Sequence, residues 1–347
     1  MKIKQIASIL ALLFILLLAA CGDENASGLS NAKGNGDSEQ EVKTIRAGTS
    51  LNKSHPGYAG LTKFKEIIEE KTQGGIIIET FHSGQIGDDR AMVESAQLGT
   101  LEVALSGAPI TNFVPELAVF DLPFLFPNEE VADAVLDGEV GQKLLNLMPE
   151  QNLIGLGFWE LGFRDITNGL RPIATADDLN GLKIRTTENE VHLDAFKALG
   201  ANPTPMSFNE LFTGLQQGVV DGQENPYAIT YLESFYEVQK YISNTHHIYS
   251  PFALVMGKNF FDSLTEEEQK IVKEAAVEAG LLQRKLNREA NDQHLASLIE
   301  EGMIYTEITA EAREEMIELV SPAIEKHSDK VGKDLVNEVF EAIEAAK

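Results

Sequence analysis

The chain has 347 residues, 43% of them hydrophobic, and a formal net charge of −26 at pH 7. A surface this acidic repels phosphate backbones and anionic headgroups, so we predict no nucleic-acid partner. The single cysteine, Cys21, excludes a disulfide within the chain. From about residue 42 onward the chain is long enough for two lobes, each with its own core.

Residues 1–20 have the features of a secretory signal. Two lysines precede the apolar stretch 6–18, which is shorter than the roughly 20 residues of a spanning helix. The sequence LAACG (18–22) resembles a bacterial lipobox, and the alternative is a plain signal peptide with an incidental cysteine. We predict a lipoprotein signal peptide over 1–20 and lipidation of Cys21. This lipid anchor would hold the protein at the outer face of the cell membrane, in an extracellular or periplasmic position.

Residues 21–44 contain hardly any large apolar side chain, so burial cannot offset the entropy lost on ordering, and we predict a flexible tether. Beyond it, strands alternate with helices. Apolar and β-branched runs predict strands over 42–47, 75–81, 101–107, 154–160 and 181–186, and helical spacing predicts helices around 61–68, 92–96 and 192–199. This alternation indicates an α/β fold with βαβ units and a mainly parallel sheet.

The segment LQQGVVDGQENP (215–226) has two interpretations. A capping-box pattern at Ser207 to Glu210 starts a short helix, which Gly218 ends, and 219–221 is predicted as the next strand. The QENP run then lies at a strand's carboxyl end, where ligands bind in open α/β sheets. Asp221 and Glu224 could form a catalytic pair. We favour a corner that these two carboxylates shape and that directs Asn225 toward a ligand.

A second capping box at Thr265 to Glu268 opens a helical pattern that runs to about Glu301. At 1.5 Å per residue this helix would span about 54 Å, enough to run across two lobes. Residues 310–346 predict two more helices.

Common enzyme motifs are absent from the sequence: there is no nucleophile elbow, Walker loop, dinucleotide glycine fingerprint or HExxH. Only His246 and His247 are close together among the histidines, and adjacent side chains diverge, so we predict no metal site and no cofactor. The Asp88-Asp89 pair could bind a cation, but carboxylates are favoured at a helix N-terminus in any case. We predict that the protein is not an enzyme, and a hydrolase using Asp221 and Glu224 is the least favoured alternative.

Two arginines follow strand patterns. Alternation in LKIR (182–185) places Lys183 and Arg185 on one face, and Arg185 ends the strand. A guanidinium there could grip a carboxylate in a two-point fork, which lysine cannot copy, or it could form a structural salt bridge. Arg164 follows the run IGLGFWELGF and is predicted at a similar strand edge.

Several motifs occur in one order along the chain: GQIGDDRAM (84–92), GFRDITN (162–168), DDLNGLKIRT (177–186), GANPTPMSFNEL (200–211) and LQQGVVDGQENP. Together they resemble the DctP-like solute-binding subunits of TRAP transporters, tripartite ATP-independent importers of organic acids. The resemblance runs from about Ile45 to the C-terminus. It implies a two-lobed, periplasmic-binding-protein-like α/β fold with a cleft and a long bridging helix. Lobe I would comprise 45–161 with about 251–290, and lobe II 162–250 with about 291–347.

The resemblance also implies site residues. The carboxylate-binding arginine of the family falls on Arg185, and its supporting arginine falls on Arg164. The cleft asparagine falls on Asn225 and the aromatic lining residue on Phe208. The N-terminal contact loop falls on Asn52 to His55, where this sequence is less regular.

Residues near the expected clamp bear on the ligand. Glu188 would repel a second carboxylate and accept hydrogen bonds from hydroxyls, while Trp159 and Phe163 could cover the C–H face of a sugar. Alternatively, Glu188 pairs with a lysine and Trp159 belongs to the core. We predict a sugar acid such as a uronate or aldonate. A C4-dicarboxylate is the alternative ligand.

The resemblance implies a receptor that closes on its ligand and delivers it to the small and large TRAP permease subunits. A sensory protein for a two-component system is the alternative of another class.

Overall fold

The computed structural model describes residues 42–347, so the predicted signal peptide, Cys21 and most of the predicted tether lie outside the described residues. The strands of the described part are β1 (Lys43–Thr49), β2 (Ile76–Phe81), β3 (Val103–Ser106), β4 (Leu153–Asn168), β5 (Lys183–Thr186), β6 (Asn202–Pro205), β7 (Gly222–Asn225), β8 (Tyr241–Gly257) and β9 (Ile304–Thr306). Its α-helices are α1 (Pro56–Lys71), α2 (Asp89–Leu98), α3 (Glu129–Asp137), α4 (Glu139–Leu145), α5 (Glu190–Ala198), α6 (Phe208–Gln216), α7 (Tyr227–Leu232), α8 (Lys258–Asp262), α9 (Glu266–Glu300), α10 (Ala310–Val331) and α11 (Lys333–Ala346).

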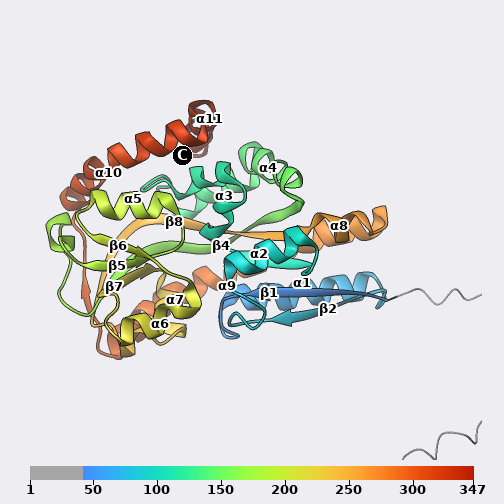
Figure 1. Ribbon diagram of the computed structural model, residues 1–347, viewed down its shortest axis with the longest axis horizontal. Coiled ribbons are helices and arrows are strands. Elements are labelled where there is room, and N and C mark those ends of the chain that lie inside the picture. The colour runs from blue at the N-terminus through green and yellow to red at the C-terminus, as the bar shows by residue number, and fades with distance from the viewer. Residues whose placement is uncertain (1–41) are drawn as a thin grey trace, which may run out of the picture. The chain divides into compact units, whose positions relative to one another are not determined.

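These strands form one mixed sheet in the order β2-β1-β3-β8-β4-β7-β5-β6, with β9 beside β8 (Figure 1). The strands at each end of the sheet are parallel: β1 pairs with β2 and β3, and β5 pairs with β6 and β7. The long strands β4 and β8 between them are antiparallel to each other. The α/β prediction is therefore confirmed, whereas the predicted parallel arrangement holds at the two ends of the sheet and fails at its centre.

Strands β4 and β8 connect the two ends of the sheet. The prediction for β4 covered only 154–160, and β8 was not predicted. The β4–β8 pairing shifts register between Gly155 and Gly157 and again between Glu160 and Gly162. Gly157 and Gly162 have φ values of 156° and 108°, which side chains other than glycine rarely adopt. These bulges let one strand continue for 16 residues through bends that interrupt the alternating sequence pattern.

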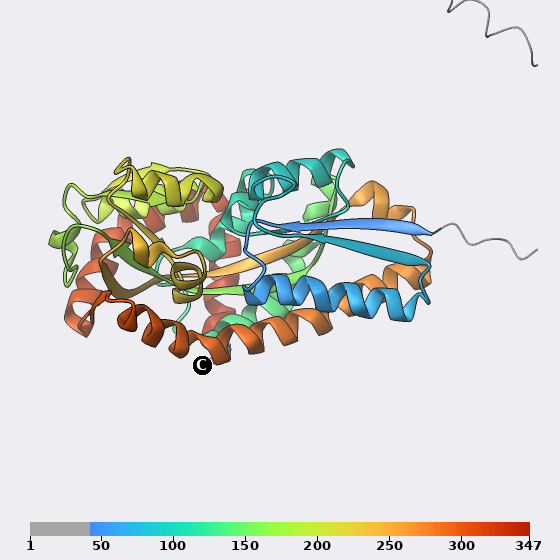
Figure 2. The ribbon, with the colours of Figure 1, turned by 90° about the horizontal axis from the view of Figure 1, so that it is seen from below.

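Helix α9 confirms the predicted capping box and the predicted length. The Thr265 side chain accepts from the backbone N–H of Glu268, the Glu268 carboxylate accepts from that of Thr265, and the helix continues for 35 residues. It runs alongside α1 and past β4 (Figure 2). The two helices after β9 were also predicted correctly. Among residues 42–347, no helix combines the length and apolar character needed to cross a bilayer.

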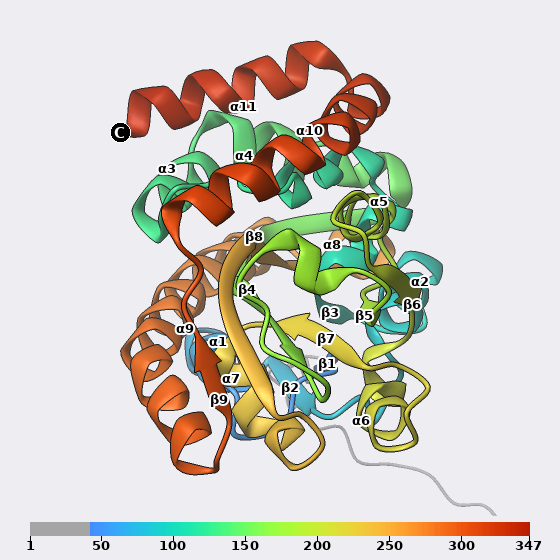
Figure 3. The ribbon, with the colours of Figure 1, turned by 90° about the vertical axis from the view of Figure 1, so that its left-hand side faces the viewer.

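Buried apolar side chains divide among cores on different parts of the sheet. One core fills the space between β1–β3, α1 and α9, and another lies beneath α2, α3, α4 and α11. A third surrounds β5 between α5 and α10. Figure 3 shows α10 and α11 beside α3 and α4, on the side of the sheet away from α9. The carboxyl ends of β1, β3, β5 and β7 are thereby held by separately packed units.

Trp159 on β4 fixes how closely α1 and α9 approach. The side chain is 1% exposed, and its Nε1 donates to the Ala276 carbonyl at 3.0 Å. A Cβ added at Gly60 or at Gly280 would lie 2.6 Å from the indole ring. These two helical glycines therefore leave the space that the ring occupies.

Replacing Gly280 with valine should lower the free energy of unfolding by about 2 kcal/mol or more, because the added side chain overpacks against Trp159. Urea denaturation measures this loss. The matched control is Leu281→Val, at a residue that is 59% exposed, for which we expect a change within about 0.5 kcal/mol. Equal losses for both variants would contradict this account of the packing.

Candidate functional site

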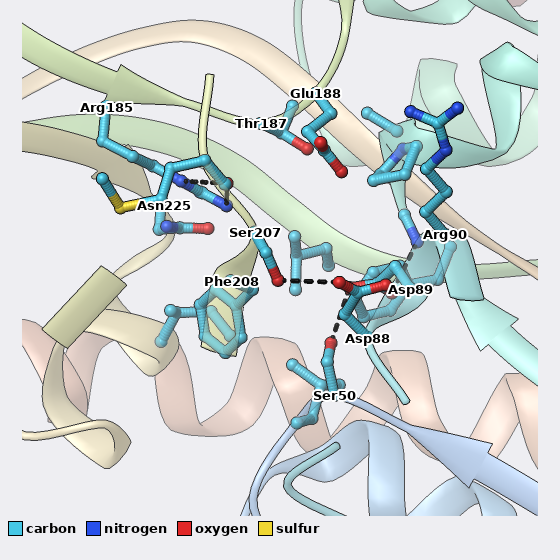
Figure 4. A pocket seen from close by; sticks show the side chains of 18 of the residues that line it. Ser50, Asp88, Asp89, Arg90, Arg185, Thr187, Glu188, Ser207, Phe208 and Asn225 are labelled. Atoms are coloured by element: carbon cyan, nitrogen blue, oxygen red, sulfur yellow. Dashed lines mark hydrogen bonds between the residues drawn. The ribbon is translucent and has the colours of Figure 1, made fainter. Parts of the chain in front are cut away.

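A cavity lies where the ends of β1, β3, β5 and β7 face the first turns of α2 and α6 (Figure 4). It contains about 540 Å³ of space not filled by protein atoms, part of it open to solvent. Its lining comprises Ser50, Leu51, Asp88, Asp89, Arg90, Gly107, Ala108, Pro109, Leu161, Arg164, Arg185, Thr187, Glu188, Met206, Ser207, Phe208, Asn225, Ile229 and Phe252. Parallel strands end at this edge, where open α/β sheets collect ligands.

Five of the eight predicted ligand residues line this cavity, and three do not. Arg164, Arg185, Glu188, Phe208 and Asn225 come together from four separate segments of the chain. Asn52, His55 and Trp159 are not among the lining residues.

Arg185 is buried without an acidic partner. Its side chain is 3% exposed, and its Nε and Nη2 both donate to the Met206 carbonyl, at 2.9 and 2.6 Å. The Phe208 ring centroid lies 6.0 Å from its Cζ. Within residues 42–347 no carboxylate oxygen lies within 4.0 Å of the guanidinium nitrogens. Burial lowers the pKa of Arg185 to about 10, so the group stays charged at neutral pH, and the carboxylates of Glu224, Asp89 and Glu188 act on it only from a distance.

Arg164 differs because its charge is already paired. It lines the cavity as predicted, but it lies inside β4, which continues to Asn168, and not at the end of a strand. Its Nε and Nη2 bind both carboxylate oxygens of Glu224, and Nη2 also donates to the Glu224 carbonyl at 2.5 Å. Burial alone would raise the pKa of Glu224, but Arg164 and nearby histidines hold it well below the ordinary value. Glu224 is therefore a structural counter-ion.

The corner that contains Asn225 is shifted from its predicted position. Residues 219–221 form a bend, and the strand consists of Gly222–Asn225 itself, so the predicted strand was placed three residues early. The reason is a contact distant in sequence: the Asp221 carboxylate accepts from the Lys183 backbone N–H at 2.8 Å, and its own N–H donates to the Lys183 carbonyl. Asn225 is 3% exposed and lies in the cavity wall beside Arg185 (Figure 4).

The capping box predicted at Ser207 does not form. The Ser207 hydroxyl donates instead to Asp88 Oδ2 at 2.9 Å, and α6 begins without a side-chain cap. Asp88 also caps α2 by accepting from the Ala91 N–H at 2.9 Å, as predicted for this pair of aspartates. One carboxylate therefore joins the first turns of two helices across the cavity.

Asp89 is a cavity residue that the sequence prediction missed. It is 9% exposed, and its carboxylate accepts from Ser50 Oγ at 2.8 Å and from the Gly107 N–H at 3.4 Å. Burial raises its pKa even though these donors oppose the shift. The adjacent aspartates in GDDR were the available signal, but the sequence did not show which of them caps the helix and which faces inward.

Glu188 lies on the opposite side of the cavity, with its carboxylate directed inward (Figure 4). It forms no salt bridge with any lysine among residues 42–347, which removes the alternative of a simple surface pair. Asp88 and Asp89 on one side and Glu188 on the other give the cavity several hydrogen-bond acceptors.

The three predicted residues outside the cavity have structural contacts that explain their positions. Trp159 packs in the core between α1 and α9, as described above. His55 is fully buried, and its Nδ1 caps α1 by accepting from the Gly57 N–H at 3.0 Å; burial lowers its pKa to about 3. Asn52 donates to the Leu232 carbonyl at 2.6 Å. Phe163, expected beside Trp159, stacks on His246.

Replacing Glu224 with glutamine should lower the free energy of unfolding at pH 7 by about 3–5 kcal/mol, because Arg164 then carries a buried, uncompensated charge. The folded-state pKa of Glu224 is depressed, so its contribution is present at neutral pH and is lost as pH falls through that value. The variant should therefore lose less stability than the parent on acidification.

Denaturation across a pH series measures both effects. Glu274→Gln removes an exposed partner of Lys71 and should cost less than about 1 kcal/mol. A Glu224→Gln protein as stable as this control would show that the ion pair does not hold the site together.

Comparisons with known proteins agree with this arrangement. The family described as "bacterial extracellular solute-binding protein, family 7" (DctP) matches residues 47–330. The sugar acid binding protein DctPAm of Advenella mimigardefordensis, solved with galactonate, is 40% identical, with a TM-score of 0.87 over 88% of this chain and 99% of that chain.

Two curated relatives match over most of their length. The 2,3-diketo-L-gulonate-binding periplasmic protein YiaO of Escherichia coli is 37% identical over 76% of this chain and 80% of its own. The C4-dicarboxylate-binding periplasmic protein DctP of Rhodobacter capsulatus is 31% identical over 81% and 85%. The fold is accordingly the two-lobed α/β fold of these proteins, and members of the family are binding receptors rather than enzymes. The chain belongs to the DctP family of extracytoplasmic solute-binding proteins that serve TRAP transporters.

Proposed function

We propose that this protein is the receptor for one sugar acid, an aldonate or uronate, whose carboxylate binds the Arg185 guanidinium. The observation that carries the proposal is the contrast between two buried arginines. Arg164 has its fork filled by Glu224, whereas Arg185 has no carboxylate within reach among the described residues. A buried cation without a directly bound counter-ion is costly, so a ligand carboxylate at Arg185 would supply the missing contact.

The acidic residues around the cavity favour a ligand that carries hydroxyls on the part away from its carboxylate. Asp88, Asp89 and Glu188 repel a second carboxylate and accept hydrogen bonds from hydroxyl groups. Ser50 and Ser207 add hydroxyls that both donate and accept. The galactonate complex of the 40% identical DctPAm supports this choice.

A C4-dicarboxylate is the second candidate. Arg90 lines the cavity and makes no salt bridge among residues 42–347, so it could meet a second carboxylate. The C4-dicarboxylate-binding relative supports this alternative. Two of the three acidic residues, Asp88 and Asp89, adjoin Arg90 on the same helix turn, which weakens its attraction for another anion.

The proposal also includes the predicted division of the protein into two lobes. Lobe I comprises 45–161 with about 251–290, and lobe II comprises 162–250 with about 291–347. The boundaries at 161/162 and 250/251 fall within β4 and β8, the strands that would bend when the cavity closes. Closure would exclude water and strengthen the contact between Arg185 and its ligand.

The closed receptor, tethered by lipidated Cys21, would then deliver the acid to the membrane permease subunits. Mass spectrometry of the mature protein would detect the lipid, and an unmodified Cys21 would contradict the anchor.

Arg185→Lys should weaken binding of the ligand by about 1–3 kcal/mol, because lysine keeps the charge but cannot hold a carboxylate at two points. Isothermal titration calorimetry measures the loss. Lys183→Arg, on the same strand with an exposed side chain, should leave affinity unchanged. If Arg185→Lys bound as tightly as the parent, Arg185 would not be the clamp.

A ligand panel tests the substrate class. At equal concentration, the ligand that binds more tightly raises the melting temperature more, so aldonates and uronates should raise it more than succinate or malate does. Neutral galactose, which lacks the carboxylate, should give no shift. Mass spectrometry of any co-purifying small molecule provides an independent answer. If succinate or malate gave the largest shift in melting temperature, the ligand would be a dicarboxylate and not a sugar acid.

A further inference from the structure

His192 is linked to the ligand cavity through Glu224, the ion-pair partner of the cavity residue Arg164. It lies on α5 with a fully buried ring, and each ring nitrogen faces a different carboxylate. Nδ1 is 3.5 Å from Glu224 Oε1, and Nε2 is 3.6 Å from Asp121 Oδ1. Neither nitrogen has a hydrogen-bond partner among the described residues. The ring thus bridges β7, which carries Glu224, and the 3-10 helix Pro115–Asp121.

The protonation state of this ring follows from its neighbours. A neutral imidazole has one N–H and one lone pair, so one of the two carboxylates would face a lone pair at close range. The imidazolium has two N–H groups and attracts both. Burial alone would lower the pKa of His192, but Glu224 and Asp121 raise it above the ordinary value. Geometry and charge therefore both favour the protonated ring.

Other groups near Glu224 do not replace this charge. His247 on β8 has Nε2 at 3.3 Å from Glu224 Oε2, but burial lowers its pKa, so the neutral form is favoured. Its Nδ1 lies 2.8 Å from Thr245 Oγ1. Arg164 contributes the other positive charge on Glu224. Asp121 is held in place by Asn189 Nδ2 at 2.7 Å.

Charged groups also face α5 from the opposite side, where α10 packs. His327 and Lys326 of α10 contact Asp194, and Lys330 contacts Glu190. His327 is buried, but the carboxylates of these pairs are partly or largely exposed, unlike those of the His192 cluster. They supply a comparison on the same helix, because Asp194 is a carboxylate next to a histidine but on the face away from the cavity.

We propose that His192 is a positioning residue of the binding site: as an imidazolium between Asp121 and Glu224, it holds the Glu224 carboxylate against Arg164 and makes capture of an anionic ligand dependent on its protonation. The inference rests on the proposed function, since it requires an acid to bind at Arg185. Loss of the His192 proton removes a buried positive charge and leaves the Asp121 and Glu224 carboxylates without their bridge. Affinity for an anion then falls.

The direction of the pH dependence follows from linkage. A bound anion stabilises the protonated ring, so ligand binding raises the pKa of His192 and affinity is highest below that pKa. If binding raises it by about one unit, affinity falls about tenfold as pH rises through the titration. Asp89 also faces the cavity and also has a raised pKa. It forms no hydrogen bond or ion pair with His192 or Asp121.

Calorimetry with galactonate between pH 5.5 and 8.5, a range in which Arg185 stays charged, tests the proposal in the intact folded protein. The parent should bind about tenfold more weakly at the alkaline end. Asp121→Asn keeps an oxygen to accept from Asn189 but removes one of the charges that hold the proton, so the midpoint should move to lower pH. Asp194→Asn, the matched change on the other face of α5, should leave the profile of the parent. His192→Gln should bind weakly with little pH dependence.

Each outcome decides the proposal. The proposal is wrong if Asp121→Asn does not move the midpoint of the pH dependence, or if Asp194→Asn moves it equally. It is also wrong if His192→Gln binds with the pH dependence of the parent. Should His192→Gln not fold, the two aspartate variants still decide. Failure of the proposed function gives a different result, because neither galactonate nor any other acid of the panel would then bind the parent protein at any pH. If galactonate does not bind but another aldonate or uronate does, the titration uses the one that binds most tightly.

Discussion

The buried ion pair between Arg164 and Glu224 is the interaction on which the site depends. Two charges removed from water are stable only when their hydrogen-bonding capacity is satisfied, and Glu224 meets this condition through contacts from several elements. Arg164 of β4, His247 of β8 and His192 of α5 all face its carboxylate on β7. Four elements are thereby fixed around one side chain. Because the pair is internally neutral, the attraction for an incoming anion is left to Arg185.

Features encoded by neighbouring residues could be predicted from the sequence, and features that depend on distant contacts could not. The capping box of α9 formed as expected because Thr265 and Glu268 lie in one turn, and the ion pair of Glu268 with Lys43 leaves its hydrogen bond to the Thr265 N–H in place. The equivalent pattern at Ser207 failed because Asp88 reaches its hydroxyl from another helix. Strand β7 began later than expected because Asp221 binds the backbone of β5.

The same distinction applies to the cavity. Strand patterns and position identified Arg185, Arg164 and Asn225, and motif resemblance assigned their roles and added Phe208; all four line the cavity. Trp159 was misjudged because an aromatic side chain beside a binding strand has the same sequence pattern whether it faces a cavity or a core. Only the tertiary structure shows that the glycines of α1 and α9 leave room for its ring on the core side. Asp89 was missed because helix capping already explained the pair of acidic residues.

The tryptophan has a consequence of its own, since Trp159 is the only one in the chain. Its indole is enclosed between α1 and α9 and is fixed by a hydrogen bond to α9, on the strand that leads to Arg164. The tryptophan fluorescence of the protein therefore originates from one buried site that does not line the cavity. A change in emission on adding a ligand reports movement of the bridging helix relative to β4, with no contribution from direct contact between ligand and fluorophore.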